Sequence, residues 1–205
     1  MAGYAMNKAR LFLAALAFGT LAACSGGTSA DDPPLAGARI GAPFTLTDQD
    51  GKQVTWDSFK GQYRLVYFGY TYCPDICPVD LQKIAQAFIR FEKQDPARAA
   101  KVQPIFITVD PDRDTVPVVK NYVRAFHPRL IGLTGTAEDI AKVAKDFAVI
   151  ASKDGDGNSK DYLVSHSRTP YLFGPDGAPI ALIPVGEGPD DTPDAILKTL
   201  DTWVK

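Results

Sequence analysis

The stretch from Arg64 to Tyr70, which reads RLVYFGY, constrains the fold more than any other part of the chain. Its continuous apolar and aromatic character is typical of a strand that is buried on both faces of a sheet. Two cysteines, Cys73 and Cys77, follow at once, and residues 78–93 then carry apolar side chains at helical spacing. A buried strand that runs through a short loop into an amphipathic helix indicates an α/β fold.

The remaining elements extend this unit. We expect hairpins over 44–56 and 168–185, strands over 102–109, 130–133 and 149–152, and helices over 116–126, 137–147 and 192–204. The turns of the two hairpins are marked by Asp50-Gly51 and by Pro175-Asp176-Gly177. This order predicts a mixed central sheet flanked by helices, in a thioredoxin-like fold with an N-terminal β-hairpin and a central insertion.

The N-terminal residues have the pattern of an export signal. Lys8 and Arg10 precede an apolar run, residues 11–23, which is too short to cross the roughly 30 Å hydrocarbon layer as a helix. The run ends in Leu-Ala-Ala before Cys24 and resembles a bacterial lipobox, whose cysteine is acylated. We therefore expect a lipoprotein signal peptide at 1–23, a lipidated Cys24 with a flexible tether at 24–38, and one domain at 39–205. An ordinary signal peptide with a chance cysteine is the alternative.

This organisation places the domain on the periplasmic side of a bacterial membrane, with a lipid anchor. Charge excludes one class of partner: the formal net charge is −2 and no stretch concentrates Lys and Arg, so we expect no nucleic acid. Cleavage before Cys24 would remove Met1 and Met6, the only methionines of the chain. Metal binding through thioethers would then be excluded, and Cys73 and Cys77 would be the only thiols left.

The spacing of Cys73 and Cys77 allows three kinds of chemistry. The buried strand delivers Cys73 to its C-terminal end, and Pro78 suits the first position of the next helix, which would put Cys77 at or near the N-cap. A helix N-terminus favours thiolate, which is both the nucleophile of disulfide exchange and a soft metal ligand. A structural disulfide is the third possibility, since an exported protein meets an oxidising compartment.

The two histidines help to choose between these possibilities. We expect His127, which lies between a helix and a strand, to be a surface or capping residue. His166 lies just before the second hairpin, in a loop that we expect to face the cysteines. It is either a solvated loop residue or a third ligand beside Cys73 and Cys77. Two thiolates and one imidazole suit copper, as three-coordinate Cu(I) or as Cu(II) with an added ligand.

Several motifs together resemble the Sco/SenC copper chaperones of cytochrome oxidase assembly. They are GYTYCPDICP at 69–78, ITVDPDRDT at 107–115, LIGLTG at 130–135, DYLVSHS at 161–167 and YLFGPDG at 171–177. The resemblance implies a thioredoxin-like domain anchored outside the membrane, with copper held by Cys73, Cys77 and His166. It also implies delivery of copper to the dinuclear site of oxidase subunit II, maintenance of that site's thiols in the reduced state, or both.

The chain departs from the family pattern at two places. Ser165 stands where the family usually has Asp, and Thr169-Pro170 stands where it usually has apolar residues. Thioredoxin reductases carry a cis-proline at the latter place. We therefore keep two hypotheses. The first is a metallochaperone without catalytic turnover, whose partners are subunit II or another copper acceptor and a periplasmic copper donor or thiol reductant. The second is a thiol-disulfide oxidoreductase that uses the Cys73/Cys77 couple.

Two further acidic stretches have simpler explanations. Residues 154–158 imitate the start of a calcium loop, but Ser159 and Ser165 stand where Gly and Glu are needed. We expect a solvated turn there. The carboxylates of Asp110, Asp112 and Asp114 are expected to belong to a polar turn after the second buried strand.

Overall fold

The computed structural model describes residues 32–155 and 161–205. The expected signal peptide, the acylation site Cys24 and the first part of the expected tether lie outside the described residues. Within them, the elements follow in the order β1 (Thr45–Asp48), β2 (Gln53–Thr55), a short 3₁₀-helix (Trp56–Phe59), β3 (Tyr63–Gly69), α1 (Ile76–Gln94), α2 (Pro96–Ala99), β4 (Val102–Thr108), α3 (Val116–Arg124), β5 (Ile131–Thr134), α4 (Ala137–Asp146), β6 (Ala151–Lys153), β7 (Val164–His166), β8 (Tyr171–Phe173), β9 (Pro179–Leu182) and α5 (Pro193–Trp203).

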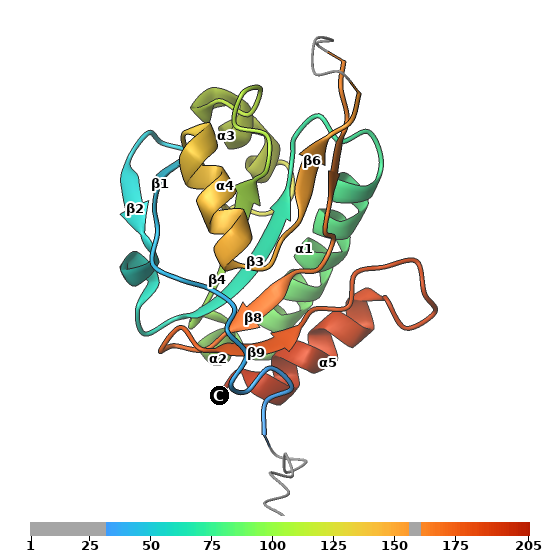
Figure 1. The fold of residues 1–205 in the computed structure, drawn as a ribbon. Helices are drawn as coiled ribbons and strands as arrows, with labels where there is room; N and C mark the ends of the chain where they lie inside the picture. The colour runs from blue at the N-terminus through green and yellow to red at the C-terminus, as the bar shows by residue number, and fades with distance from the viewer. Residues whose placement is uncertain (1–31, 156–160) are drawn as a thin grey trace, which may run out of the picture. The chain divides into compact units, whose positions relative to one another are not determined.

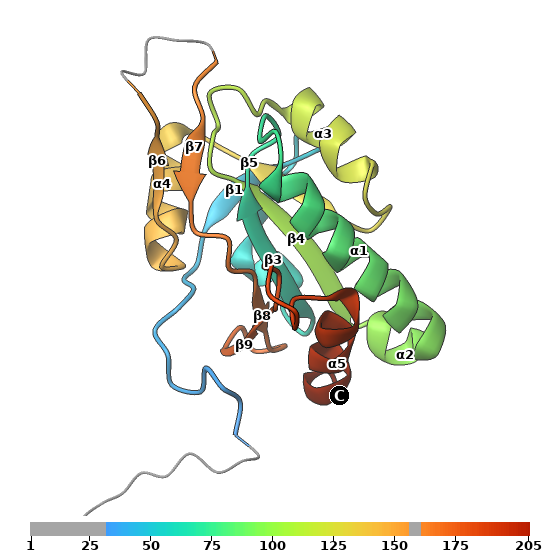
Figure 2. The same cartoon turned by 90° about the vertical axis from the view of Figure 1, so that its right-hand side faces the viewer.

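The central sheet is mixed, as the sequence predicts. Its strand order is β2-β1-β5-β4-β3-β8-β9, in which β3, β4 and β5 are parallel and the two hairpins pair antiparallel at the edges. Helices α1, α3 and α5 cover one face, and α4 covers the other (Figures 1 and 2). The fold class is therefore confirmed.

Strand β3 lies in the interior of the sheet, between β4 and β8. All seven of its residues are buried, and it pairs with β4 from Tyr63↔Val102 to Gly69↔Thr108. The continuous apolar run is explained by its place between β4 and β8, under helices on both faces. Strand β3 ends at Gly69, so the cysteine loop begins at the carboxyl end of a parallel strand, where sheets of this kind place their sites.

Helix α1 begins earlier than the sequence suggests. Its first residue is Ile76 and its N-cap is Asp75, so Cys77 lies inside the first turn rather than at the N-cap, and Pro78 is the third helical residue. Proline is tolerated there because the first N–H groups of a helix have no carbonyl partner within the helix. The cysteine is still at the positive end of the helix dipole.

The segment that carries His166 is a strand and not a loop. Strand β7 pairs antiparallel with β6, and His166 lies opposite Ala151. This two-stranded sheet lies on the α4 side of the central sheet (Figure 2). The peptide bond between Thr169 and Pro170 is trans, because the described residues contain no cis bond, so the cis-proline of thioredoxin reductases is not found at this position.

His127 is buried, which contradicts the expectation of a surface residue. Only 5% of its surface is exposed, its Nε2 lies 3.2 Å from Oε2 of Glu92, and its Nδ1 accepts a hydrogen bond of 3.2 Å from the Arg129 backbone N–H. Both ring nitrogens thus have partners within the protein. The expected capping role agrees with the structure, because the hydrogen bond from the Arg129 N–H to the His127 ring closes the turn before β5.

In the described part of the chain, none of the helices has the length and apolar character needed to cross a membrane.

Candidate metal centre

The two cysteines lie side by side at the start of α1. Cys77 is fully buried, whereas Cys73 is partly exposed, and both are free thiols. The backbone N–H of Cys77 donates a hydrogen bond of 3.4 Å to Sγ of Cys73. The helix N-terminus is therefore directed at the sulfur of Cys73 and not at that of Cys77.

The surroundings make the two thiols chemically different. Burial raises the pKa of Cys73, but hydrogen bonds from the N–H groups of Cys77, Asp75 and Ile76 outweigh it, so this pKa lies below that of an ordinary thiol. For Cys77 burial dominates and raises the pKa to about 12. Cys73 is consequently the nucleophilic sulfur, and Cys77 remains protonated at neutral pH as long as no cation lies beside it.

His166 faces the buried thiol. Its Nε2 lies 3.2 Å from Sγ of Cys77, although 89 residues separate the two in the chain. Burial lowers the pKa of His166, so the ring is neutral at pH 7. Its Nδ1 lies 2.9 Å from the carbonyl oxygen of Ser167, which can only accept, so Nδ1 carries the proton. Nε2 is then free of a proton and accepts from the Cys77 thiol, which is the state a metal ligand needs.

Tyr70 holds the histidine strand from the other side. Its ring meets that of His166 edge-on at 5.9 Å, and its hydroxyl accepts a hydrogen bond of 3.2 Å from the backbone N–H of Val164. The residue that ends the buried run before the cysteines thus also fixes β7. The sequence did not indicate this contact.

The aspartates after β4 form a more specific arrangement than the polar turn that the sequence suggests. Asp110 and Asp114 are completely buried, and only Asp112 is exposed. Asp114 accepts hydrogen bonds from the backbone N–H of Thr71 (3.0 Å), from the Thr71 hydroxyl (2.6 Å) and from the Thr108 hydroxyl (2.6 Å). Burial raises the pKa of Asp114. This carboxyl group anchors the loop two residues before Cys73.

Ser165 points away from the histidine ring. Neighbouring residues of a strand face opposite sides, and the Ser165 hydroxyl donates to the carboxylate of Asp154, at 2.9 and 3.0 Å from its two oxygens. Because β7 is a strand, position 165 cannot present its side chain to the same side as His166. Ser165 therefore contacts the Asp154 carboxylate on the side of β7 opposite His166.

A further carboxylate, which no sequence pattern indicates, lies beside the cysteines. Asp80, in α1, is completely buried and binds Arg168 through two hydrogen bonds of 2.8 and 3.1 Å. The hydroxyl of Tyr67 in β3 donates a third, at 3.2 Å. Nothing in the sequence pairs these residues, since 88 positions separate Asp80 from Arg168.

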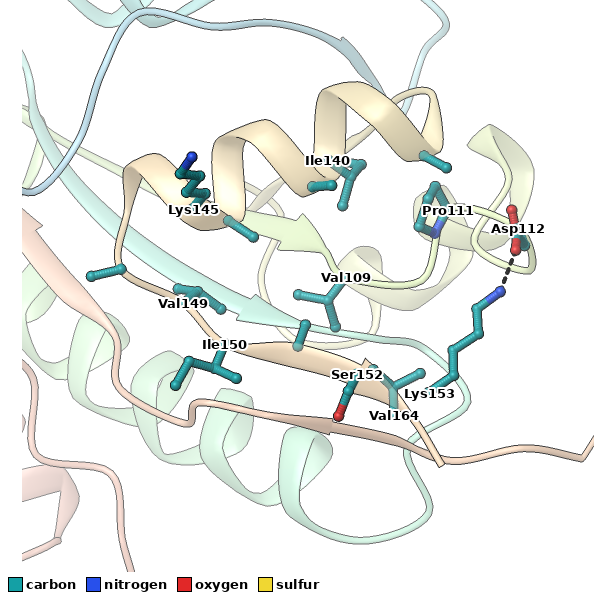
Figure 3. A pocket seen from close by; sticks show the side chains of 15 residues that line it. Val109, Pro111, Asp112, Ile140, Lys145, Val149, Ile150, Ser152, Lys153 and Val164 are labelled. Carbon is teal, nitrogen blue, oxygen red and sulfur yellow. Dashed lines mark hydrogen bonds and ion pairs between the residues drawn. The ribbon is translucent and has the colours of Figure 1, made fainter. Parts of the chain in front are cut away.

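Two hollows flank β7. The larger, of about 720 Å³, lies between α4 and β6, and side chains such as Ile140, Val149 and Val164 point into it (Figure 3). Its lining is mostly apolar and contains neither cysteine. The smaller hollow, of about 320 Å³, is lined by Cys73 and His166 among others. The Cys73 thiol and the His166 ring are therefore reached from the smaller hollow.

The arrangement is close to a metal site without being a preformed one. In residues 32–155 and 161–205, no group of three or more His, Cys, Asp or Glu side chains is already placed to hold a metal ion. Sγ of Cys77 lies within hydrogen-bond distance of Nε2 of His166, and Cys73 lines the same hollow as His166. The structure therefore brings together the three residues that the sequence singles out, with one sulfur turned toward the helix N-terminus.

Comparison with known proteins relates the chain to one family. The family described as SCO1/SenC matches residues 32–203. Protein SCO1 homolog 1, mitochondrial, of Arabidopsis thaliana is 40% identical over 175 residues, which cover 85% of this chain and 51% of that protein. Protein SCO2 homolog, mitochondrial, of Bos taurus is 47% identical over 134 residues, which cover 65% of this chain and 50% of that protein. The chain thus spans about half the length of these curated relatives.

Solved structures agree with this relation. Copper-bound ScoI of Bradyrhizobium japonicum has a TM-score of 0.70 and 40% identity, over 80% of this chain and 99% of that one. Copper-bound Sco1 of yeast has a TM-score of 0.71 and 32% identity, over 80% of this chain and 88% of that one. BsSco, a member of the Sco family of cytochrome c oxidase assembly proteins in which a disulfide switch was identified, has a TM-score of 0.59 and 28% identity, over 85% and 98%.

Proposed function

The chain belongs to the SCO1/SenC family, and from this premise we propose that it is a copper-binding metallochaperone with Cys73, Cys77 and His166 as ligands. The copper is cargo that the protein receives and passes on. The observation that carries the proposal is the contact of 3.2 Å between His166 Nε2 and Cys77 Sγ, two potential ligands from distant parts of the chain.

The donor atoms fit copper in kind. Thiolates are soft ligands that suit Cu(I), and a neutral imidazole adds a ligand that suits Cu(I) and Cu(II). The proton on Nδ1 of His166 is held by the Ser167 carbonyl, which orients the ring with Nε2 toward the sulfur. Binding would require Cys77 to lose its proton and Cys73 to turn from the backbone N–H of Cys77, so copper uptake should release protons.

Titration of the reduced protein with Cu(I) and with Cu(II) tests the ligand set. We expect one copper ion per chain, and His166→Ala should weaken the affinity while the fold is kept. His127→Ala is the matched control, because that ring already has two partners inside the protein. Equal stoichiometry and affinity in wild type and His166→Ala would refute the three-ligand proposal.

A thiol-disulfide oxidoreductase remains the second candidate, supported by the unequal thiols. The lowered pKa of Cys73 suits an attacking thiolate, and the buried Cys77 suits a resolving thiol. For this function His166 would be dispensable. Reduction of a dinuclear copper-site peptide disulfide by the His166→Ala variant at the wild-type rate, with copper affinity weakened, would favour the reductase over the chaperone.

The acceptor that we propose is the dinuclear copper site of cytochrome c oxidase subunit II. Support comes from the Sco relative BsSco, which belongs to a family of oxidase assembly proteins. We further propose that cleavage before Cys24 and acylation of that cysteine anchor the domain on the periplasmic side of a bacterial membrane. Mass spectrometry of membrane-extracted protein should then show an acylated N-terminal cysteine. A chain that retains residues 1–23 would refute the anchor.

A further inference from the structure

A single buried carboxylate joins the three segments that bear the proposed copper ligands. Asp80 belongs to α1, three residues after Cys77, and is completely buried. One of its partners, Arg168, follows His166 by two residues, and the other, Tyr67, belongs to β3, which runs into the Cys73 loop. The cluster of Asp80, Arg168 and Tyr67, called the Asp80 cluster below, therefore lies where these three segments meet.

The geometry of the ion pair makes it a rigid connection. Nε and Nη2 of Arg168 bind the two oxygens of Asp80, at 3.1 and 2.8 Å, so the planar guanidinium is fixed in both distance and orientation. The Arg168 side chain is 28% exposed and Asp80 is fully buried, so solvent competes little for the carboxylate. The contact holds the backbone just after His166 against α1.

The other hydrogen bonds of this segment run elsewhere. The backbone N–H of Val164 donates to the Tyr70 hydroxyl, and the N–H of Ser167 donates to the carbonyl of Ile150 at 2.9 Å. These bonds fix β7 to β6 and to the cysteine loop, but they do not set its distance from α1. That distance decides whether Nε2 of His166 reaches Sγ of Cys77.

We propose that Asp80 and Arg168 are positioning residues, which set His166 within ligand distance of Cys77 through the Asp80 cluster. This deepens the proposed function and rests on it, because it states how the third ligand is brought to the other two. Neither side chain is a ligand. Loss of a residue that orients a metal-binding histidine costs about ten- to a hundredfold in metal affinity.

The decisive variant is Arg168→Met, which removes the fork of hydrogen bonds and keeps most of the side-chain volume. We expect it to lower the affinity for Cu(II) about ten- to a hundredfold and to shift the thiolate-to-copper absorption band. When His166 is already replaced by Ala, Arg168→Met should change neither the Cu(II) affinity nor the absorption band. A merely structural residue would weaken binding equally in both backgrounds, and that result would overturn the proposal.

A conservative variant and a matched control complete the comparison. Arg168→Lys keeps the charge but loses the two-point contact, so its affinity should fall between those of wild type and Arg168→Met. Arg129→Met removes another arginine that binds a carboxylate of α1, that of Glu92, at 2.9 Å. It should leave copper affinity at the wild-type value. A loss as large in Arg129→Met as in Arg168→Met would contradict a specific role.

Two measurements on the reduced, metal-free protein test the positioning independently of copper. Nitrogen NMR of the His166 ring should show one tautomer in wild type and a mixture in Arg168→Met. Alkylation of the buried Cys77 should be faster in that variant, because the histidine strand no longer covers it. If wild type failed to bind copper, the proposed function would fall, yet these measurements would still decide the positioning role. An unchanged ring signal and alkylation rate would refute it.

Should Arg168→Met fail to fold, Arg168→Lys and Asp80→Asn carry the same test, since both keep a hydrogen bond at the cluster. Circular dichroism and thermal unfolding identify folded variants before any titration. A folded Asp80→Asn protein with wild-type copper affinity and wild-type ring signals would contradict the proposal.

Discussion

At the scale of single residues, the thiols of Cys73, in the loop after β3, and Cys77, in the first turn of α1, differ in burial. Cys77 is fully buried with its pKa raised to about 12, whereas the pKa of the partly exposed Cys73 is lowered by N–H groups of the first helical turn. Copper or a disulfide partner must therefore meet Cys73 first. The order in which the two sulfurs react therefore depends on how the first turn of α1 is placed, and not on the cysteine spacing alone.

Selective alkylation tests this order. Limiting iodoacetamide at pH 7 should label Cys73 well before Cys77 in the reduced, metal-free protein, because a lowered pKa leaves more thiolate at a given pH. The labelling rate of Cys73 should rise with pH and level off below the pH at which an ordinary thiol does. Fragmentation of the labelled peptide assigns the site, and Cys73→Ser supplies the rate of Cys77 alone. Faster labelling of Cys77 would contradict the structure.

Asp114 gives a second prediction at this scale. Asp114→Ala removes three hydrogen bonds and leaves the Thr71 N–H without its partner, so we expect a loss of about 2 to 4 kcal/mol in the free energy of unfolding. Copper affinity should fall as well, because Thr71 fixes the loop before Cys73. Asp112→Ala, from the exposed part of the same turn, should cost less than about 0.5 kcal/mol. Urea unfolding measures both, and equal losses would contradict the assignment.

Residues of unusual chemistry can be singled out from this sequence, whereas residues that act through a folded partner cannot. Cys73, Cys77 and His166 stand out because thiols and imidazoles are scarce in this chain. Asp80 and Arg168 are ordinary residues of a charged class, and only the contact between α1 and the segment after β7 gives them a role. Such pairings depend on the folded distance, which no local pattern contains.

At the scale of elements, the two hairpins differ in how much room their turns leave. Gly51 and Gly177 both have positive φ, of 80° and 90°. A Cβ at Gly51 would meet nothing within 4 Å, whereas one at Gly177 would lie 2.9 Å from Nε1 of Trp56 and 3.2 Å from Nη1 of Arg64. Arg64 is itself buried, with its guanidinium 4.2 Å from the Trp56 ring centroid, so neither neighbour can move freely.

This difference predicts unequal effects of the same substitution. Gly51→Ala should cost about 1 to 2 kcal/mol of unfolding free energy, from the left-handed backbone alone. Gly177→Ala should cost more, about 2 to 5 kcal/mol, because overpacking against the buried arginine adds to the backbone strain. Urea unfolding of the two variants at one pH provides the comparison. If Gly177→Ala lowered the free energy of unfolding no more than Gly51→Ala, the turn between β8 and β9 would have to rearrange readily around the added Cβ.

The elements that the sequence predicts best are those with a long uniform pattern. Strand β3 is buried throughout, as its apolar run predicts, and α4 begins at Ala137, the predicted first residue of that helix. Strand β7 lies where the sequence predicts a loop, because it has only three residues and gains its conformation from pairing with β6. Helix α1 begins two residues before the predicted start, since a proline is compatible with any position of the first turn.

At the scale of the described domain, copper binding and folding should be coupled. The proposed ligands come from the loop after β3, from the first turn of α1 and from β7, which lie together only when the central sheet is formed. The unfolded chain keeps the Cys73/Cys77 pair but loses its proximity to His166. A metal that needs all three ligands therefore binds the folded state more tightly than the unfolded one, and stabilises it.

Thermal unfolding of the reduced protein measures this coupling. With free copper held by a buffer at a hundred times the dissociation constant, we expect stabilisation by about 2.7 kcal/mol, or about 5 to 10 °C in Tm for a domain of this size. At the same free copper concentration, His166→Ala should show a smaller increase, because the remaining cysteine pair is also present in the unfolded chain and discriminates less between the two states. The size of the difference between the two proteins thus reports how much of the copper affinity depends on the folded position of β7. An equal shift in wild type and His166→Ala would mean that the cysteine loop alone binds copper, and that the approach of β7 to α1 serves another purpose.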